Sequence, residues 1–127
     1  DIGKITIDHS ILNKDTPLTA EENELVQRHP EIGHRILNAS EEFADLSMIV
    51  LTHHEHYDGR GYPLNLEGED IKLEARIIHI CEAYDAMVSD HPYHPAISKE
   101  EALQELKKYS GKEFDPKLVE LFIEIMS

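Results

Sequence analysis

A stretch of eleven residues, His53 to Pro63, constrains this chain most, because it combines potential metal ligands with a loop that glycines allow to turn sharply. The stretch reads HHEHYDGRGYP, and a short apolar run from Met48 to Leu51 leads into it. The histidines therefore stand where a buried segment opens. Adjacent histidines, two carboxylates and two glycines in this order indicate a metal site beside a shaped loop.

The pattern HHExxDGxGYP resembles the signature of the HD-GYP domains, which are bacterial members of the HD metal-dependent phosphohydrolase superfamily and cleave cyclic di-GMP. The resemblance continues from Asp1-Ile2-Gly3-Lys4 to Phe114-Asp115-Pro116, over nearly the whole chain. It implies a metal-dependent phosphodiesterase that hydrolyses cyclic di-GMP to pGpG or GMP in bacterial second-messenger signalling.

The resemblance also implies the site residues. The metal ligands would be Asp1, His29, His53, His54 and Glu82. Asp1 would bridge metals and Lys4 would contact a phosphate, and these two would be the catalytic residues. The substrate-binding residues would be Lys4, Gly59, Gly61, Tyr62 and Pro63, the last four bordering the substrate groove. Two or three divalent ions are implied. Mixed histidine and carboxylate ligands favour Fe or Mn, and Zn also fits the ligand type.

The residues alone leave alternatives open at several of these positions. His29 lies on an apolar helical face, where a histidine bonded to a backbone carbonyl is the more common case. Neighbouring helical residues point about 100° apart. His53 and His54 would therefore serve different ions, or one of them would only support the other. Glu82 and Asp85 share a helical face, and Arg76 is an alternative salt-bridge partner for either carboxylate.

Three positions depart from the family pattern. Glu82 stands where the family has a metal-binding Asp, so its carboxylate reaches one methylene further. His91 and His94 stand where the family usually has Arg. A neutral imidazole does not replace a guanidinium fork in gripping phosphate, which weakens the expectation of tight dinucleotide binding.

Composition narrows the classes of partner. The formal net charge is −14 with histidine neutral. A protein that binds duplex nucleic acid or an anionic membrane needs a basic surface. We therefore expect neither as a partner of this acidic chain. The single Cys81 fits a reducing cytoplasm, and the sequence has no signal peptide or membrane-length apolar run. The chain begins at Asp1, so we expect it to be part of a longer protein, with the superfamily histidine just upstream.

Hydrophobic periodicity predicts an all-α fold, a single HD-type helical bundle over residues 1–127 with about five main helices. The expected helices cover about 20–37 with a break near His29, 46–54, 73–88, 99–109 and 116–125. A short extended piece and a helical turn should precede them, over 5–12. The helix at 73–88 is apolar on most sides and should be the central buried one. In the last helix, the core face should consist of Leu118, Leu121, Phe122 and Ile125.

Two classes of function remain in competition. The first is the phosphodiesterase, acting on cyclic di-GMP or a related nucleotide. The alternative is a degenerate HD-GYP module that binds a partner protein or nucleotide without catalysis, which the departures at Glu82, His91 and His94 favour. Diguanylate cyclase-type domains or an upstream regulatory domain are the expected protein partners, and a homodimer is a further alternative.

Because histidines bind metal when neutral, metal affinity should fall below about pH 6.

Overall fold

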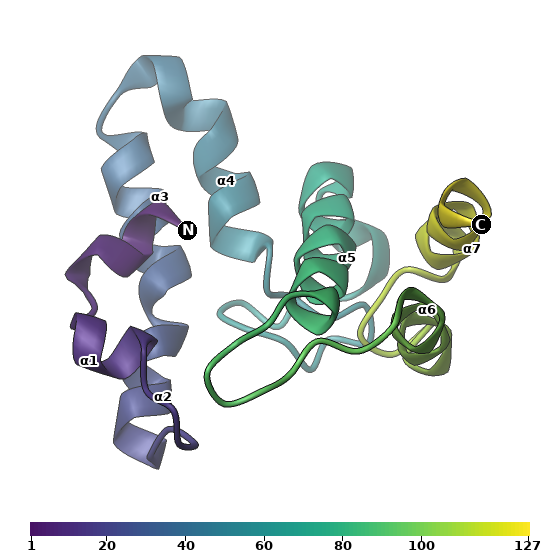
Figure 1. Cartoon of the computed structure of the whole chain (residues 1–127). Coiled ribbons are helices and arrows are strands. Elements are labelled where there is room, and N and C mark those ends of the chain that lie inside the picture. Colours follow the sequence, from purple (N-terminus) through teal and green to yellow (C-terminus); the bar gives the residue numbers. More distant parts are fainter.

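The computed structural model describes all residues, 1–127, and its regular elements are helices joined by loops (Figure 1). Apart from short 3₁₀ turns, the elements are α1 (His9–Leu12), α2 (Ala20–Gln27), α3 (His29–Asn38), α4 (Ala44–Thr52), α5 (Leu73–Val88), α6 (Lys99–Lys108) and α7 (Pro116–Met126). The 3₁₀ turns are η1 (Ile2–Thr6), η2 (Glu41–Phe43) and η3 (Gly68–Asp70). The predicted all-α class is confirmed.

The first predicted helix is two helices, α2 and α3, and this adds one to the five expected. α2 begins with a capping box, in which Thr19 and Glu22 bond each other's backbone N–H groups. The chain breaks at Arg28, and α3 begins at His29 with Pro30 in its first turn. Proline is tolerated there because the first N–H groups of a helix have no partner within it. The break sets His29 at a helix start, with its ring beside the end of α2.

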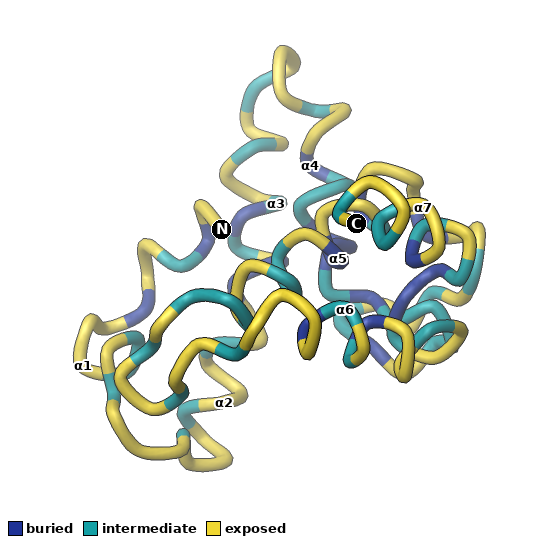
Figure 2. The backbone as a smooth tube through the Cα atoms, turned by 45° about the vertical axis from the view of Figure 1, so that its right-hand side comes forward, coloured by how far each residue is buried: buried dark blue, intermediate teal, exposed yellow.

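The helices form two groups around the loop that follows α4 (Figures 1 and 2). In the first group, α3 packs against α4 and against the N-terminal turn η1. In the second group, α5, α6 and α7 enclose the main hydrophobic core, built from Ile80, Leu106, Phe114 and Val119. α5 contacts α4 and so joins the two groups. The site described below lies where they meet.

Two expectations about the core are wrong. α5 is not buried on most sides, because its packed neighbours leave one face open. Ile77 and Ile78 are 43% and 38% exposed, and Cys81 is also exposed. On α7, Leu121 and Ile125, both expected inside, are exposed as well. The extended piece expected near Ile5 is instead part of η1.

The helices are also short and only moderately apolar. None has both the length and the hydropathy that a membrane span requires.

Candidate metal centre

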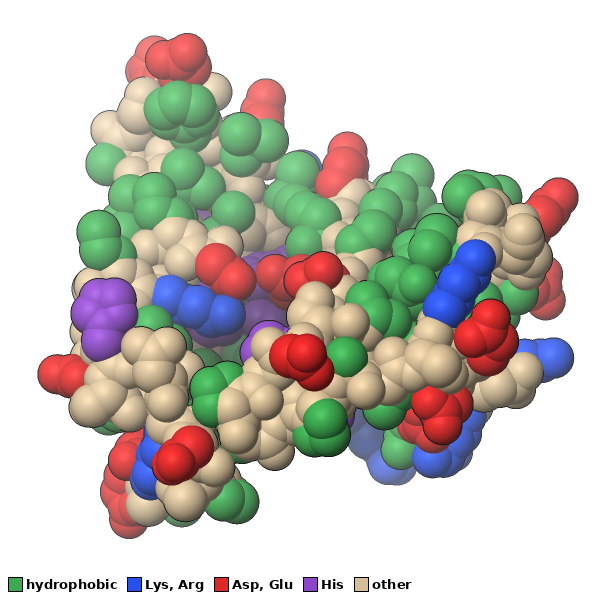
Figure 3. Space-filling model, viewed as in Figure 1, with side chains coloured by type: hydrophobic (Ala, Val, Ile, Leu, Met, Phe, Trp, Pro, Cys, Tyr) green, Lys and Arg blue, Asp and Glu red, His purple; other side chains and the backbone are tan.

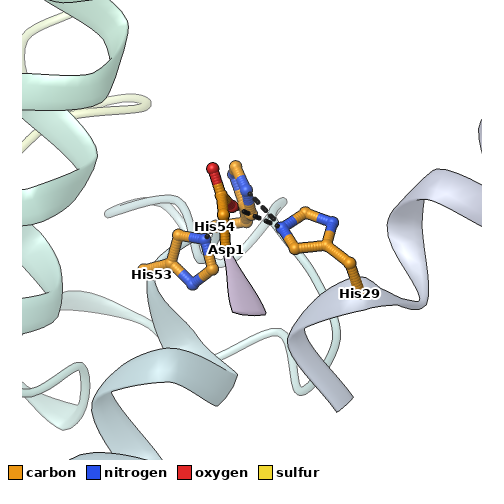
Figure 4. A group of neighbouring side chains, drawn as sticks. All are labelled: Asp1, His29, His53 and His54. Atoms are coloured by element: carbon orange, nitrogen blue, oxygen red, sulfur yellow. Dashed lines mark hydrogen bonds and ion pairs between the residues drawn. The ribbon is translucent and has the colours of Figure 1, made fainter. Parts of the chain in front are cut away.

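Four potential ligands converge at the meeting of the two helix groups: Asp1, His29, His53 and His54 (Figure 4). We call them the Asp1 cluster. One ligand atom from each lies within 4.8 Å of the others. They come from the chain start, the first residue of α3 and the loop after α4. The fold therefore brings together three segments that are separate in the sequence.

His53 and His54 lie closer together than the sequence suggests. The expected helix ran to His54, but α4 ends at Thr52 and His53 is its C-cap. Because His54 lies beyond the helix, the 100° rule no longer separates the two side chains. Their ring centroids are 4.1 Å apart. Both rings can thus face the same small volume.

Glycines bring Asp1 to the histidines. Gly3 in η1 packs directly on the backbone of α3 at His29 and Gly33, and a side chain at residue 3 would overlap the His29 carbonyl. Gly33 in turn leaves room for Val50 of α4. This close approach of backbones is available only to glycine. It fixes η1 against α3 and thereby sets Asp1 beside His29.

The hydrogen bonds of His29 and His53 define which ring nitrogens carry protons. Nδ1 of His29 lies 2.6 Å from the Val26 carbonyl oxygen, and Nδ1 of His53 lies 2.6 Å from that of Val50. A carbonyl only accepts, so each Nδ1 donates its proton. In the neutral ring, each Nε2 then presents a lone pair. The buried Nε2 of His53 has no hydrogen-bond partner.

These lone pairs face a carboxylate. Oδ1 of Asp1 lies 3.2 Å from Nε2 of His29 and 3.6 Å from Nε2 of His53. Burial lowers the pKa of His29 to about 4 and also lowers the pKa of His53, so near pH 7 both rings are neutral. Acceptors that face one another repel unless a cation lies between them. A divalent ion fits this donor set, because ligand atoms around a tetrahedral ion are about 3.3 Å apart.

Glu82 and Lys4 stand at the edge of the Asp1 cluster. Oε2 of Glu82 lies 3.8 Å from Nε2 of His53 and 4.0 Å from Nε2 of His54. Nζ of Lys4 lies 3.0 Å from Oδ2 of Asp1. Arg76, the alternative partner for Glu82 or Asp85, instead pairs with Asp115 at the start of α7.

The Asp1 cluster opens into a cavity of about 410 Å³. In the space-filling view, histidine side chains lie recessed behind acidic and basic ones (Figure 3). The lining is mostly polar, and four of its five Asp, Glu and Lys residues are acidic: Asp1, Lys4, His54, His79, Glu82, Asp85, His91 and Glu113, with Ala83 and Ala86. His91 thus faces the cavity, whereas His94 lines a separate depression beside Met87.

The glycine loop supports the histidines from behind and does not line this cavity. Tyr62 stacks on His54 with ring centroids 5.2 Å apart, and Pro63 follows it in a cis peptide. Gly61 is buried against the backbone of His54 to His56, and Gly59 has a φ of 81°. Their expected place at the border of a substrate groove therefore stays a prediction. Glu55 accepts hydrogen bonds from the backbone N–H groups of Leu64 and Leu66 and so fixes the loop.

Sequence reasoning missed three residues of the cavity region. His56, His79 and Glu113 form a second group whose ligand atoms lie within 4.8 Å of one another. His79 falls inside the apolar helix predicted at 73–88, and Glu113 lies in the turn between α6 and α7. Neither position carries a local motif, so only the tertiary fold brings these residues together.

Comparison with known proteins supports the family. The HD domain family profile matches residues 1–118. The chain belongs to the HD domain family. It is 42% identical over 125 residues to a cyclic di-GMP phosphodiesterase response regulator of Xanthomonas campestris, covering 97% of this chain and 33% of the relative. It is 40% identical over 126 residues to a 3′3′-cGAMP-specific phosphodiesterase of Vibrio cholerae, covering 98% of this chain and 24% of the relative.

A solved structure agrees with this assignment. The crystal structure of a cyclic GMP-AMP-specific phosphodiesterase of V. cholerae aligns with a TM-score of 0.67 and 25% identity, over 97% of this chain and 32% of that one. This HD chain thus spans about a third or less of these relatives. The HD-type recognition made from the sequence is confirmed.

Proposed function

We propose that this HD domain is the catalytic part of a metal-dependent phosphodiesterase that hydrolyses cyclic di-GMP. The observation that carries the proposal is Oδ1 of Asp1, which faces the unprotonated Nε2 atoms of His29 and His53. An arrangement of acceptors around one point suits a cation. Relatives named as cyclic di-GMP phosphodiesterases supply the substrate class.

The Asp1 cluster and Glu82 would hold two or three divalent ions, Fe or Mn first and Zn as an alternative. When bound, such ions neutralise phosphate charge and make a water nucleophilic near neutral pH. The protein residues contribute position and charge. Asp1 would bridge the ions and Lys4 would neutralise a phosphate oxygen, while backbone carbonyls hold His29 and His53 in one tautomer.

Cavity electrostatics agree with this assignment of roles. The lining contains four carboxylates, Asp1, Glu82, Asp85 and Glu113, and a single lysine, Lys4. A dianionic nucleotide would be repelled by this surface without bound cations. Substrate binding should therefore depend on prior metal binding.

The test is hydrolysis by the purified protein after metal removal and reloading with Mn²⁺ or Fe²⁺. Cyclic di-GMP, 3′3′-cGAMP and cyclic GMP are compared, and His53→Asn serves as the inactive control. We expect metal-dependent production of pGpG or GMP from cyclic di-GMP. Preferred cleavage of 3′3′-cGAMP would identify that related dinucleotide as the substrate in place of cyclic di-GMP.

A second candidate function is a non-catalytic module that binds a nucleotide or a partner, such as a diguanylate cyclase-type or regulatory domain. His91 favours it, because it faces the cavity where the family usually has arginine. Dinucleotide binding by the metal-loaded protein without any hydrolysis would decide for this alternative.

A further inference from the structure

The second group of ligand-type side chains contributes two residues to the cavity into which the Asp1 cluster opens. It consists of His56, His79 and Glu113, which we call the His79 triad. The side chain of His79 is 9% exposed, whereas those of His56 and Glu113 are each 32% exposed. His79 and Glu113 both line the cavity. The triad is therefore reachable from solvent, with one buried member.

Its geometry matches a cation better than an internal hydrogen bond. Nε2 of His79 lies 3.4 Å from Oε1 of Glu113, and the buried nitrogen has no hydrogen-bond partner. Nε2 of His56 lies 4.0 Å from the same oxygen. Ligand atoms of a tetrahedral zinc ion are about 3.3 Å apart. The distance of 3.4 Å between His79 and Glu113 already fits this value. The ring of His56 would have to move slightly closer to Oε1 of Glu113.

Backbone contacts hold the triad in place before any ligand binds. The Tyr57 N–H donates to the Glu113 carbonyl at 3.1 Å, and the Asp58 N–H donates to that of Lys112 at 2.8 Å. These bonds join the loop that carries His56 to the turn that carries Glu113. The ring of His79 packs on Phe114, with centroids 5.2 Å apart. The fold thus sets the backbone of the loop and the turn and the ring of His79.

We propose that His56, His79 and Glu113 form a second metal site that binds a zinc-type divalent cation. Two histidines and one glutamate are a donor set that Zn²⁺ accepts, with a fourth position left for water or substrate. The site is distinct from the Asp1 cluster, since no ligand is shared. The rings of His54 and His79, one from each group, have centroids 6.2 Å apart.

A cation here would add positive charge to an acidic cavity. Lys4 is the only lysine or arginine of the lining, against four carboxylates. A metal at the His79 triad would offset Glu113 and give an anionic ligand a second attachment point. The metal site itself does not depend on the proposed catalytic function.

The test counts metal ions in the protein. Metal-free protein is equilibrated with Zn²⁺, and bound metal is measured by elemental analysis and isothermal titration calorimetry. Glu113→Gln keeps the side-chain shape and removes the charge, and His56→Gln changes a partly exposed loop residue that should leave the fold intact. Glu120→Gln and His9→Gln are the matched controls, because both residues are exposed and lie outside the two groups.

We expect Glu113→Gln and His56→Gln each to lose one metal equivalent, or to weaken it at least about 100-fold, while the controls match the parent. His53→Asn should lose metal from the Asp1 cluster and keep the equivalent at the His79 triad. Unchanged stoichiometry and affinity in both triad variants would overturn the proposal. Absence of cyclic di-GMP hydrolysis would overturn the proposed function and leave this metal count unaffected.

Discussion

Nε2 of His54 lies 3.1 Å from Nε2 of His29. Nδ1 of His29 donates a hydrogen bond to the Val26 carbonyl oxygen. In the neutral ring, Nε2 of His29 can therefore only accept a hydrogen bond. His54 must then donate from Nε2 or, once a cation binds, present its own lone pair. Burial lowers the pKa of His54 to about 2, so the ring stays neutral and available as a ligand. A cation bound by both rings would therefore replace the hydrogen bond between His54 and His29.

The first prediction concerns His53, whose buried Nε2 has no hydrogen-bond partner. His53→Asn should lower Mn²⁺ affinity at least about 100-fold, beyond the usual cost of losing an outer-shell partner. His34→Gln is the matched control, because its ring bonds the Ser47 carbonyl away from the cluster. Calorimetric titration measures both. Equal affinity in parent and His53→Asn would remove His53 from the ligand set.

The second prediction concerns Glu82, whose carboxylate lies 3.8 Å from His53 Nε2. Glu82→Gln keeps the size and removes the charge, so metal affinity should fall about tenfold, less than for His53→Asn. Glu74→Gln, an exposed change on the same helix, is the control. If Glu82→Gln binds metal like the parent, Glu82 lies outside the ligand set and the departure from the family Asp has no effect on the metals.

The sequence predicted the fold class and most helices because capping boxes and apolar spacing are local signals. The bounds predicted for α5, Leu73–Val88, are confirmed. The prediction that α5 is buried on most sides is wrong. An apolar pattern shows which face can be buried, while packing decides which face is buried. Ile77 and Ile78 stay 43% and 38% exposed, so the packed helices cover this face of α5 only in part.

The site was less accessible to sequence reasoning. The set Asp1, His29, His53 and His54 came from the family resemblance, and the fold brings the four together. The helical geometry predicted for His53 and His54 does not apply, because both residues lie beyond Thr52, where α4 ends. His79 and Glu113 lie on separate elements and share no motif, so no local pattern could pair them.

The third prediction is a pH dependence of stability. Burial lowers the folded-state pKa of His29 from 6.5 to about 4. Between these values the unfolded chain binds a proton at this residue that the folded chain does not. The metal-free protein should therefore lose stability as pH falls from 6.5 to 4, on the order of 3 kcal/mol from His29 alone. Urea unfolding at several pH values measures the loss.

The comparison variant for this experiment is His29→Gln, which cannot titrate. Its unfolding free energy should depend less on pH over the same interval, and an equal dependence would contradict the assignment to His29.

The lowered pKa of His29 also revises the pH expected for metal release. Because His29 stays neutral well below its ordinary pKa, metal should be retained below pH 6, the value expected for unperturbed histidines.

The fourth prediction tests the approach of Gly3 to α3. Gly3→Ala places a methyl group against the His29 carbonyl, so η1 must move and carry Asp1 away from the histidines. Metal affinity should fall more than about tenfold. Gly68→Ala is the control: it has a φ of 58° but open space around it, so it should cost about 1 kcal/mol of stability through strain. Parent-like metal affinity in Gly3→Ala would show that this contact does not position Asp1.

The fifth prediction concerns His91, which faces the cavity. His91→Arg would add a permanent positive charge and a planar pair of donors at the mouth of an acidic site. The Kd for cyclic di-GMP should fall about tenfold in the metal-loaded protein, a gain of about 1.4 kcal/mol. His94→Arg is the matched control, because His94 lines a different depression. Equal gains in both variants would indicate general charge attraction, and a gain confined to His91→Arg would identify His91 as a determinant of dinucleotide affinity.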